Sequence, residues 1–121
     1  MPYLRLETNV PQEKIPIDLS AKLSELLSKS LGKPLNFCCA SVTGGVNMSW
    51  GGTNDPAAQA TLMSIGALGV EENKRHSKAL TDCITQALGI DADRMYISFD
   101  DKKASDVGYR KTTFHEIFGS K

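Results

Sequence analysis

Two parts of this chain repeat one local pattern, and this repeat constrains the fold more than any other feature. In the first part, leucines recur with helical spacing up to Gly32, and a run of strand-forming residues, 37–43, follows. In the second part, an apolar stripe ends at Gly89, and a second strand-like run, 95–99, follows. The two glycines are 89 − 32 = 57 residues apart. Internal repeats dictate architecture, so the chain is expected to contain two copies of one supersecondary unit.

Each copy also has a strand before its helix. The first begins with a predicted strand over residues 3–10, in which apolar and polar side chains alternate. The helix that follows has a leucine stripe formed by Leu19, Leu23, Leu26, Leu27 and Leu31. The second copy begins with a predicted strand over residues 57–65, and acidic residues near Glu71 suit the positive end of its helix. Its stripe consists of Leu80, Ile84, Ala87 and Leu88.

Two β-α-β units predict an α/β fold, a two-layer sandwich with four strands in one sheet and both helices on one face. The other face of such a sheet is left uncovered. Strand residues expected there, such as Cys38, Ala40, Thr61 and Met63 or their neighbours, are apolar or small. We therefore expect that face to pack against other copies of the chain, so that a pocket can lie between subunits.

The length and charge of the chain limit its functions. A chain of 121 residues with 40% hydrophobic residues predicts one domain with one core. Fourteen basic residues balance fourteen acidic ones, which gives no electrostatic support for binding nucleic acid or an anionic membrane. Polar residues interrupt the N-terminal segment, unlike the apolar core of a signal peptide. The sequence predicts a cytosolic protein, and any export would use a route without a cleaved signal.

The cysteines and histidines do not indicate a metal site or a disulfide. Cys38, Cys39 and Cys83 have no Cys-x-x-Cys spacing, and we expect them to be buried reduced thiols. His76 and His115 are isolated, and we interpret both as surface or cap residues.

Pro2, directly behind Met1, is the first candidate for chemistry. Removal of Met1 by methionine aminopeptidase gives a free secondary amine on a rigid ring. An ordinary α-amino group has a pKa of about 7.7–8.0, and burial or a nearby cation lowers it. A neutral amine can act as a general base on a carbon next to a carbonyl. Many chains begin with Met-Pro without any chemical role, so the dipeptide alone leaves both readings open.

Short motifs along the chain match one known family in order and spacing. They are Met1-Pro2, Thr8–Pro11, Leu31–Pro34, Met48–Gly52, Asp55-Pro56, Ser64–Gly66, Asp93–Ile97 and Thr112–Phe114. The chain resembles the tautomerase superfamily, in the branch of macrophage migration inhibitory factor and D-dopachrome tautomerase. The resemblance implies one domain over residues 1–114, with 115–121 as an extension of unknown role. It also implies a homotrimer of β-α-β-β-α-β protomers whose sheets surround a central channel.

The resemblance further implies keto–enol tautomerisation of phenylpyruvate-type and dopachrome-type substrates, without a cofactor. Pro2 would be the general base and would later return the proton. Lys33 would bind the substrate carboxylate and help to keep Pro2 neutral. Tyr96 of a neighbouring subunit would line the pocket and donate a hydrogen bond. Other contacts are implied for the Ser64 and Ile65 backbone, and apolar walls for Val107 and Phe114.

Ordinary structural roles are the alternatives for these residues. Lys33 could be a solvated lysine at a helix end, and Ser64 could satisfy a strand end. Tyr96, Val107 and Phe114 could belong to the core.

Several positions depart from the family pattern near the pocket. Ser98 stands where the vertebrate cytokine has an asparagine that contacts substrate from the adjacent subunit. Tyr109 replaces a tryptophan at the pocket rim, and Phe37 replaces a tyrosine near the mouth. Ala57 and Ala60 occupy the positions of the cytokine's Cys-x-x-Cys. The thiol–disulfide oxidoreductase activity of that motif is therefore expected to be absent.

Two functions of different classes remain. One is the tautomerase. The other is a secreted, cytokine-like immune modulator that acts through a cell-surface receptor, with a vestigial pocket. Gln12 and Gly45 stand where the vertebrate cytokine carries an arginine and an aspartate implicated in receptor mimicry. The catalytic set is intact apart from Ser98, so the sequence favours the enzyme.

Overall fold

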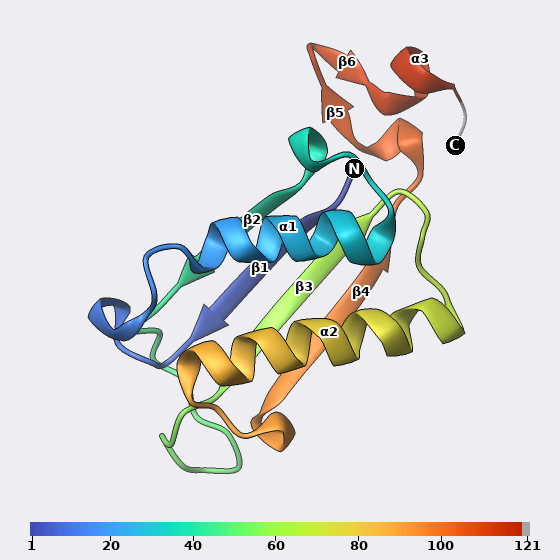
Figure 1. Cartoon of the computed structure of the whole chain (residues 1–121). Coiled ribbons are helices and arrows are strands. Elements are labelled where there is room, and N and C mark those ends of the chain that lie inside the picture. The colour runs from blue at the N-terminus through green and yellow to red at the C-terminus, as the bar shows by residue number, and fades with distance from the viewer. Residues whose placement is uncertain (120–121) are drawn as a thin grey trace.

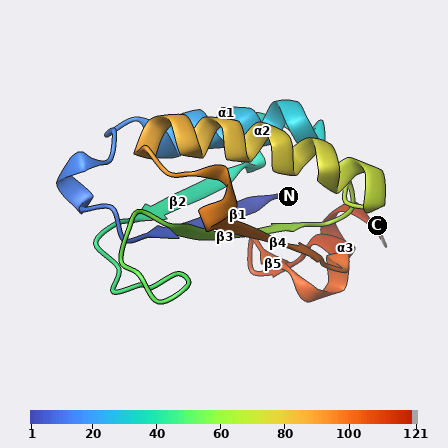
Figure 2. The ribbon, with the colours of Figure 1, turned by 90° about the horizontal axis from the view of Figure 1, so that it is seen from below.

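The computed structural model describes residues 1–119, and it contains one four-stranded sheet in the order β2-β1-β3-β4 (Figure 1). The strands are β1 (Tyr3–Thr8), β2 (Cys39–Thr43), β3 (Ala58–Ser64) and β4 (Met95–Asp101). Strands β1 and β2 are parallel, as are β3 and β4, whereas the central pair β1 and β3 is antiparallel. Helices α1 (Leu19–Leu31) and α2 (Val70–Leu88) lie together on one face of the sheet (Figure 2). The predicted two-layer sandwich of two β-α-β units is confirmed.

The repeat extends to the way in which the two helices end. Gly32 has a left-handed backbone with φ of +67°, and the amides of Gly32 and Lys33 both reach back to the Ser28 carbonyl. Gly89 has the same φ, and its amide bonds to the Thr85 carbonyl. Glycine adopts this conformation without the penalty that a Cβ atom brings, and the motif satisfies the last helical carbonyls. The turn at Gly32 sets the direction in which Lys33 leaves α1.

The core lies between the sheet and the two helices. Alternate residues of the central strands point into it, as the period-two pattern predicts, and Leu4 and Leu6 are fully buried. The helical stripes meet them from above, and burying each large aliphatic side chain contributes about 1.5–3 kcal/mol. The largest buried core side chains from the helices and β3 are Leu19, Leu23, Leu27, Leu62, Leu80 and Ile84.

Strand β2 differs from the prediction in start and burial. A 3-10 turn over Leu35–Phe37 precedes it, and as an edge strand it alternates between exposed and half-buried residues. Cys38 and Ala40 pack against the core, so in β2 the uncovered face carries their neighbours Cys39 and Ser41, the other alternative that the sequence left open. Small residues of similar polarity do not distinguish the two faces, and a one-residue slip exchanges them.

The three cysteines are free thiols, as expected, but they are not buried. Cys38 and Cys83 are half-buried, and Cys39 is exposed. Partial burial raises the pKa of the Cys38 thiol, although the nearby N-terminal amine acts in the opposite direction. The exposure of Cys39 follows from the position of β2 at the sheet edge.

The prediction that His76 is a surface or cap residue is wrong, because its side chain is 1% exposed. Its Nδ1 lies 2.6 Å from Ser30 Oγ of α1, and its Nε2 lies 2.9 Å from the Ala67 carbonyl oxygen. A carbonyl only accepts, so Nε2–H donates to Ala67 and Nδ1 accepts from the Ser30 hydroxyl. His76 therefore ties α1, α2 and the loop after β3 together. Its position four residues before Leu80 extends the buried stripe of α2 by one turn.

Replacing His76 with alanine is expected to lower the free energy of unfolding by about 2–4 kcal/mol, because it leaves a cavity and removes two buried hydrogen bonds. Denaturant unfolding at a fixed protein concentration measures this change. His115→Ala is the matched control, because His115 is exposed and its loss should change stability by less than about 0.5 kcal/mol. Equal stability of the two variants would contradict the bridging role of His76.

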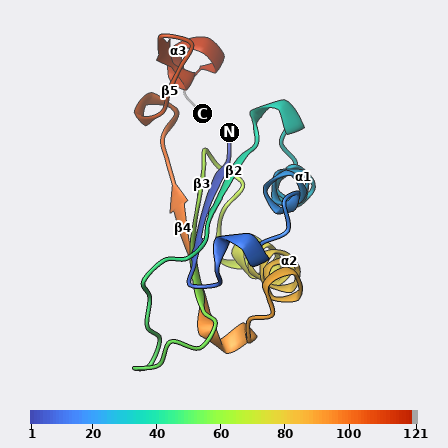
Figure 3. The same ribbon diagram turned by 90° about the vertical axis from the view of Figure 1, so that its left-hand side faces the viewer.

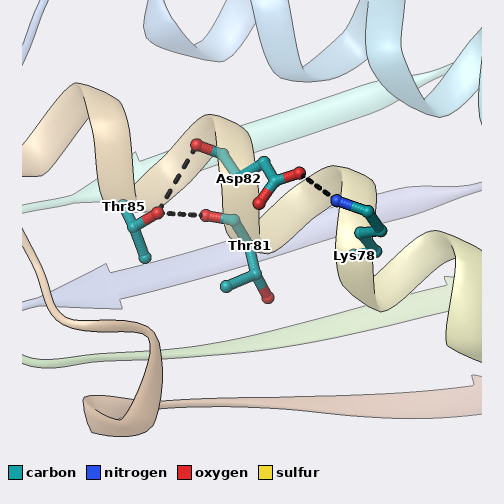
Figure 4. A network of polar contacts seen from close by, with 4 residues as sticks. All are labelled: Lys78, Thr81, Asp82 and Thr85. Atoms are coloured by element: carbon teal, nitrogen blue, oxygen red, sulfur yellow. Dashed lines mark hydrogen bonds and ion pairs between the residues drawn. The ribbon is translucent and has the colours of Figure 1, made fainter.

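A network of polar contacts joins four residues of α2, Lys78, Thr81, Asp82 and Thr85 (Figure 4). Lys78 Nζ lies 2.9 Å from Asp82 Oδ2, and both side chains are more than half exposed. The Thr85 hydroxyl donates to the Thr81 carbonyl over 2.7 Å. Exposed ion pairs of this kind contribute little to stability, so substitutions on this face of α2 are expected to be tolerated. Within residues 1–119, no helix combines the length and apolar character needed to cross a membrane.

A short C-terminal unit stands at the end of the sheet where β1 begins (Figure 3). Strands β5 (Gly108–Tyr109) and β6 (Thr112–Thr113) form a hairpin, and helix α3 (Phe114–Phe118) follows. The loop residues Arg110 and Lys111 both have positive φ, which a two-residue hairpin of the common primed type requires. Of the predicted extension 115–121, the last two residues lie outside the described part of the chain.

Candidate active site

A cavity of about 230 Å³ lies beside the N-terminus, and its lining is mostly apolar. Its walls are formed by Met1, Lys33, Phe37, Ile65, Phe114 and Phe118. A larger hollow, of about 660 Å³, lies on the outer face of α2, but polar side chains such as Lys74, Lys78 and Asp82 line it. Binding sites for small organic molecules are mostly apolar with a few convergent polar groups. The N-terminal cavity has this character, and the outer hollow does not.

Pro2 is held rigidly next to Met1, which lines this cavity, and Pro2 itself is not among the lining residues. Its side chain is fully buried, and its carbonyl accepts a 3.1 Å hydrogen bond from the Cys39 amide of β2. Chain termini are disordered unless something ties them down, and here the first strand and β2 do so. The burial of Pro2 is more complete than a position at the end of a chain would suggest.

The N-terminal amino group, carried by Met1 in this structure, has an unusual environment. Burial lowers its pKa below the ordinary value, and the positive charge of Lys33 lowers it further. Cys38 acts in the opposite direction, with the smallest effect of the three. Both main causes disfavour a protonated amine at this point of the molecule, so the surroundings favour a neutral base.

Lys33 is hydrogen-bonded to a backbone carbonyl at the cavity. Its Nζ donates a 3.0 Å hydrogen bond to the Ile65 carbonyl oxygen, and its own carbonyl accepts from Ser28 Oγ over 2.6 Å. The side chain is half-buried, so the alternative of a fully solvated lysine at the helix end does not describe it. An ammonium group has three donors, and Ile65 takes one of them. A carboxylate in the cavity could take another.

The turn after β3 positions Ile65. The Ser64 carbonyl accepts the Lys102 amide over 2.9 Å, and the Gly66 amide donates to Asp101 Oδ1 over 3.0 Å. Both contacts fasten the turn to β4. The Ser64 hydroxyl is buried and has no hydrogen-bond partner within residues 1–119. Of the two residues with predicted backbone contacts, Ile65 lines the cavity and its carbonyl is bonded to Lys33, whereas Ser64 does not line it and its carbonyl is bonded to Lys102.

Of the two residues predicted to form apolar walls, Phe114 lines the cavity and Val107 does not. Phe114 is 5% exposed, and its ring stacks on Tyr109 at 4.9 Å with an interplanar angle of 10°. The Phe114 amide donates to the Val107 carbonyl over 3.1 Å. Val107 and Tyr109 are not among the residues that line the cavity, and they support Phe114 instead.

Two further aromatic residues of the wall have no predicted role in binding. Phe37 was predicted only to lack a hydroxyl near the mouth, and Phe118 lies in the extension without assigned role. Phe37 meets Phe114 edge-on at 6.2 Å, and Phe118 stacks on Phe114 at 5.5 Å. The spacing of Phe114 and Phe118, four residues apart after a threonine cap, is the sequence signal for Phe118.

Tyr96 and Ser98 do not lie in this cavity. They pair with Gln59 and Thr61, whereas the Pro2 end of the sheet is near Met63. Tyr96 is 71% exposed on the uncovered face of the sheet, with its ring 4.3 Å from that of Trp50. Within one chain these two residues are therefore separate from the site. Their contribution from a neighbouring subunit stays a prediction.

Comparison with known proteins gives consistent results in sequence and structure. The family model described as "Macrophage migration inhibitory factor (MIF)" matches residues 1–115. A macrophage migration inhibitory factor homolog of Trichuris trichiura is 42% identical over 114 residues, which are 94% of this chain and 100% of that protein. An MIF-like protein of Caenorhabditis elegans is 36% identical over 116 residues, 96% of this chain and 97% of that one. The solved structure of the Trichinella spiralis factor superimposes with a TM-score of 0.90 at 37% identity, covering 93% of this chain and 99% of that one.

Proposed function

Because this chain belongs to the macrophage migration inhibitory factor family, we propose that it is a cofactor-independent keto–enol tautomerase. Its substrates are phenylpyruvate-type α-keto acids and dopachrome-type compounds, with Pro2 as the general base. One observation carries the proposal. The N-terminal amino group lies in a mostly apolar cavity beside Lys33, where burial and charge both lower its pKa.

The first step is a proton transfer from carbon to nitrogen. After removal of Met1, the neutral Pro2 nitrogen takes a proton from the carbon next to the keto group. The C–H electron pair forms the C=C bond, and the carbonyl π pair moves to oxygen. Solvent protonates that oxygen to give the enol, and the Pro2 ammonium loses its proton to solvent, which restores the neutral amine. In the reverse reaction the protonated Pro2 gives its proton to carbon, and the enol oxygen loses its proton to solvent. A base is most effective when its pKa lies near the working pH. Burial and the Lys33 charge lower the pKa of the Met1 amine, and we expect them to act in the same direction on the Pro2 amine that replaces it.

The other residues of the cavity bind and orient the substrate. Lys33 holds the carboxylate by a charge-assisted hydrogen bond, and its contact with Ile65 fixes the ammonium group. Phe114, supported by Tyr109 and Val107, faces the aromatic ring of the substrate. In this proposed binding mode, the carbon that loses the proton would lie between the anchored carboxylate and the ring, within reach of the Pro2 nitrogen.

Turnover of phenylpyruvate tests this function. The assay uses protein whose N-terminus has been verified by mass spectrometry as Pro2, and it follows the approach to the keto–enol equilibrium against the uncatalysed rate. Acetylation of the Pro2 nitrogen converts the amine into a non-basic amide. Loss of catalysis on acetylation would support the proposal. No acceleration by the verified protein would overturn it.

We further propose that the protein assembles as a homotrimer through the uncovered sheet face, which would bring Tyr96 and Ser98 of one subunit to the site of another. Light scattering should then give a mass near three times 13.1 kDa. Thr61→Arg, beside Arg5 and Ser98 on that face, is expected to dissociate the trimer and remove most of the turnover together. Thr81→Arg, on the solvated face of α2, is the matched control and should change neither. A fully active monomer would contradict the shared site.

The names of the relatives support a second candidate, an extracellular ligand that affects macrophage migration. Two departures from the vertebrate cytokine bear on it. Gln12 accepts the Gly44 amide over 2.8 Å, and the Gly45 amide bonds to the Val10 carbonyl over 2.8 Å, so these positions form a closed polar turn without the cytokine's charges. A cell-migration assay with the Pro2→Gly variant separates the two functions, because a ligand role would survive the loss of catalysis.

A further inference from the structure

Four aromatic rings form one continuous cluster at the cavity. Tyr109, Phe114 and Phe118 stack in sequence, with centroid distances of 4.9 and 5.5 Å and interplanar angles of 10° and 24°. Phe37 stands edge-on to all three, at 5.8 to 6.2 Å and 72° to 86°. Stacked and edge-on pairs at these distances are the favoured arrangements of aromatic rings. Three of these rings, Phe37, Phe114 and Phe118, line the cavity, and Tyr109 stacks on Phe114 without lining it.

Phe118 completes this wall from outside the residues that the family model matches, which end at residue 115. Three contacts position it through α3. The Thr113 hydroxyl accepts the Glu116 amide over 3.3 Å, the Thr112 hydroxyl donates to the Glu116 carboxylate, and the Gly119 amide donates to the His115 carbonyl over 2.8 Å. The last turn of α3 thus sets Phe118 above Phe114, four residues earlier.

The exposure of Phe118 is unusual for an aromatic residue in a stack. Its side chain lines the cavity, yet the residue remains 59% exposed, whereas Phe114 beneath it is 5% exposed. A ring that served only to fill the core would be covered. Phe118 instead has one face on the stack and much of its remaining surface accessible to a bound molecule.

We propose that Phe118 is a specificity-determining residue that makes the cavity prefer a carboxylate with an aromatic ring over an equally large aliphatic one. This inference rests on the proposed function, because Lys33 must hold the carboxylate for the ring to reach Phe118. A benzene ring in the cavity can stack on Phe118 or meet it edge-on, the two arrangements that aromatic rings favour. A cyclohexyl ring buries similar area but offers no quadrupole to Phe118.

A matched ligand pair tests the preference without any reaction. The probes are 3-phenylpropanoate and 3-cyclohexylpropanoate, which share the carboxylate and chain length and differ in the ring, and their binding is followed by NMR titration. The wild type should bind the phenyl compound more tightly. Both Phe118→Ala and Phe118→Leu should reduce this preference by about 2- to 12-fold, the range measured for aromatic pairs. Leucine keeps an apolar side chain without a ring. If Phe118→Leu loses the preference for the phenyl compound as Phe118→Ala does, aromatic contact is the cause of the preference.

His115→Ala is the control, because His115 is an exposed residue of the same helix. The inference is overturned if the wild type shows no preference for the phenyl compound. It is also overturned if both Phe118 variants keep the preference, or if His115→Ala loses as much of the preference as they do.

Kinetics separate this inference from the proposed function. With phenylpyruvate, Phe118→Leu should raise KM by a similar factor and leave kcat nearly unchanged, because the ring of Phe118 is expected to contact the substrate ring and not the carbon that loses the proton. An unchanged KM would show that Phe118 does not determine specificity, and the proposed tautomerase function would be unaffected. If the wild type does not turn over phenylpyruvate, the proposed function fails, and the ligand pair alone decides the role of Phe118.

Discussion

Pro2→Gly is expected to lower the kcat of phenylpyruvate tautomerisation by about 10²- to 10⁴-fold, the range of a well-placed general base. Glycine at the chain start keeps an amine but loses the ring that fixes the nitrogen. Pro2 is fully buried, and the Cys39 amide holds its carbonyl, so the ring has one defined position, directly behind the Met1 amine whose pKa Lys33 lowers. Steady-state kinetics on protein with a verified N-terminus measures the loss.

The loss must come from the site and not from unfolding. Pro16→Gly is the matched control, because Pro16 is an exposed proline of a loop and should leave kcat unchanged. The Pro2→Gly variant should keep its thermal unfolding transition and its mass by light scattering. A folded, assembled variant that retained most of its turnover would remove Pro2 from the role of base.

Lys33→Ala has the second largest expected effect, and it changes two quantities together. Loss of the charge-assisted contact, about 1.5–3 kcal/mol, should raise KM for carboxylate substrates by about 10- to 150-fold. The acidic limb of the pH profile of kcat/KM should also move to higher pH. The amine acts only when neutral, and without the Lys33 charge its pKa rises, so it is protonated at a higher pH. Burial is the larger cause of the lowered pKa and remains in the variant, which limits this shift.

An esterified substrate separates the two roles of Lys33. Without a carboxylate, the effect of Lys33→Ala on KM should shrink, whereas the shift of the acidic limb should persist. Lys29→Ala, an exposed lysine in the last turn of the same helix, should show neither effect. The same acidic limb in the wild type and in Lys33→Ala would reduce Lys33 to a carboxylate anchor and leave burial as the cause of the low pKa.

The parts of the fold that follow from local patterns could be predicted. The leucine stripe ending at Gly32, the second stripe ending at Gly89 and the alternation of Leu4 and Leu6 each have a period that only one type of element satisfies. The position of Lys33 beside the N-terminus came from the family resemblance, because no local pattern relates two residues so far apart in the chain.

The errors have physical causes. In β2, neighbouring small residues such as Cys38 and Cys39 carry no contrast in hydrophobicity, so the register could not be read. His76 is isolated in the sequence, and its burial depends on partners in α1 and in the loop after β3 that the sequence does not show. Phe118 is a single aromatic residue near the end of the chain, and its stacking partners are apparent only in three dimensions.

The central claim is that the Pro2 nitrogen is the base, and a comparison of two forms of one sequence tests it most directly. In one form Met1 has been removed and Pro2 carries a free secondary amine. In the other Met1 is retained and the Pro2 nitrogen is a non-basic amide. Proton NMR in D₂O follows the exchange of the methylene protons of phenylpyruvate for deuterium, with the mass of each form verified. If the Pro2 nitrogen is the base, exchange should be rapid with the processed form and at least about 10²-fold slower with the Met1-retaining form. Equal exchange rates for the two forms would contradict this role of Pro2.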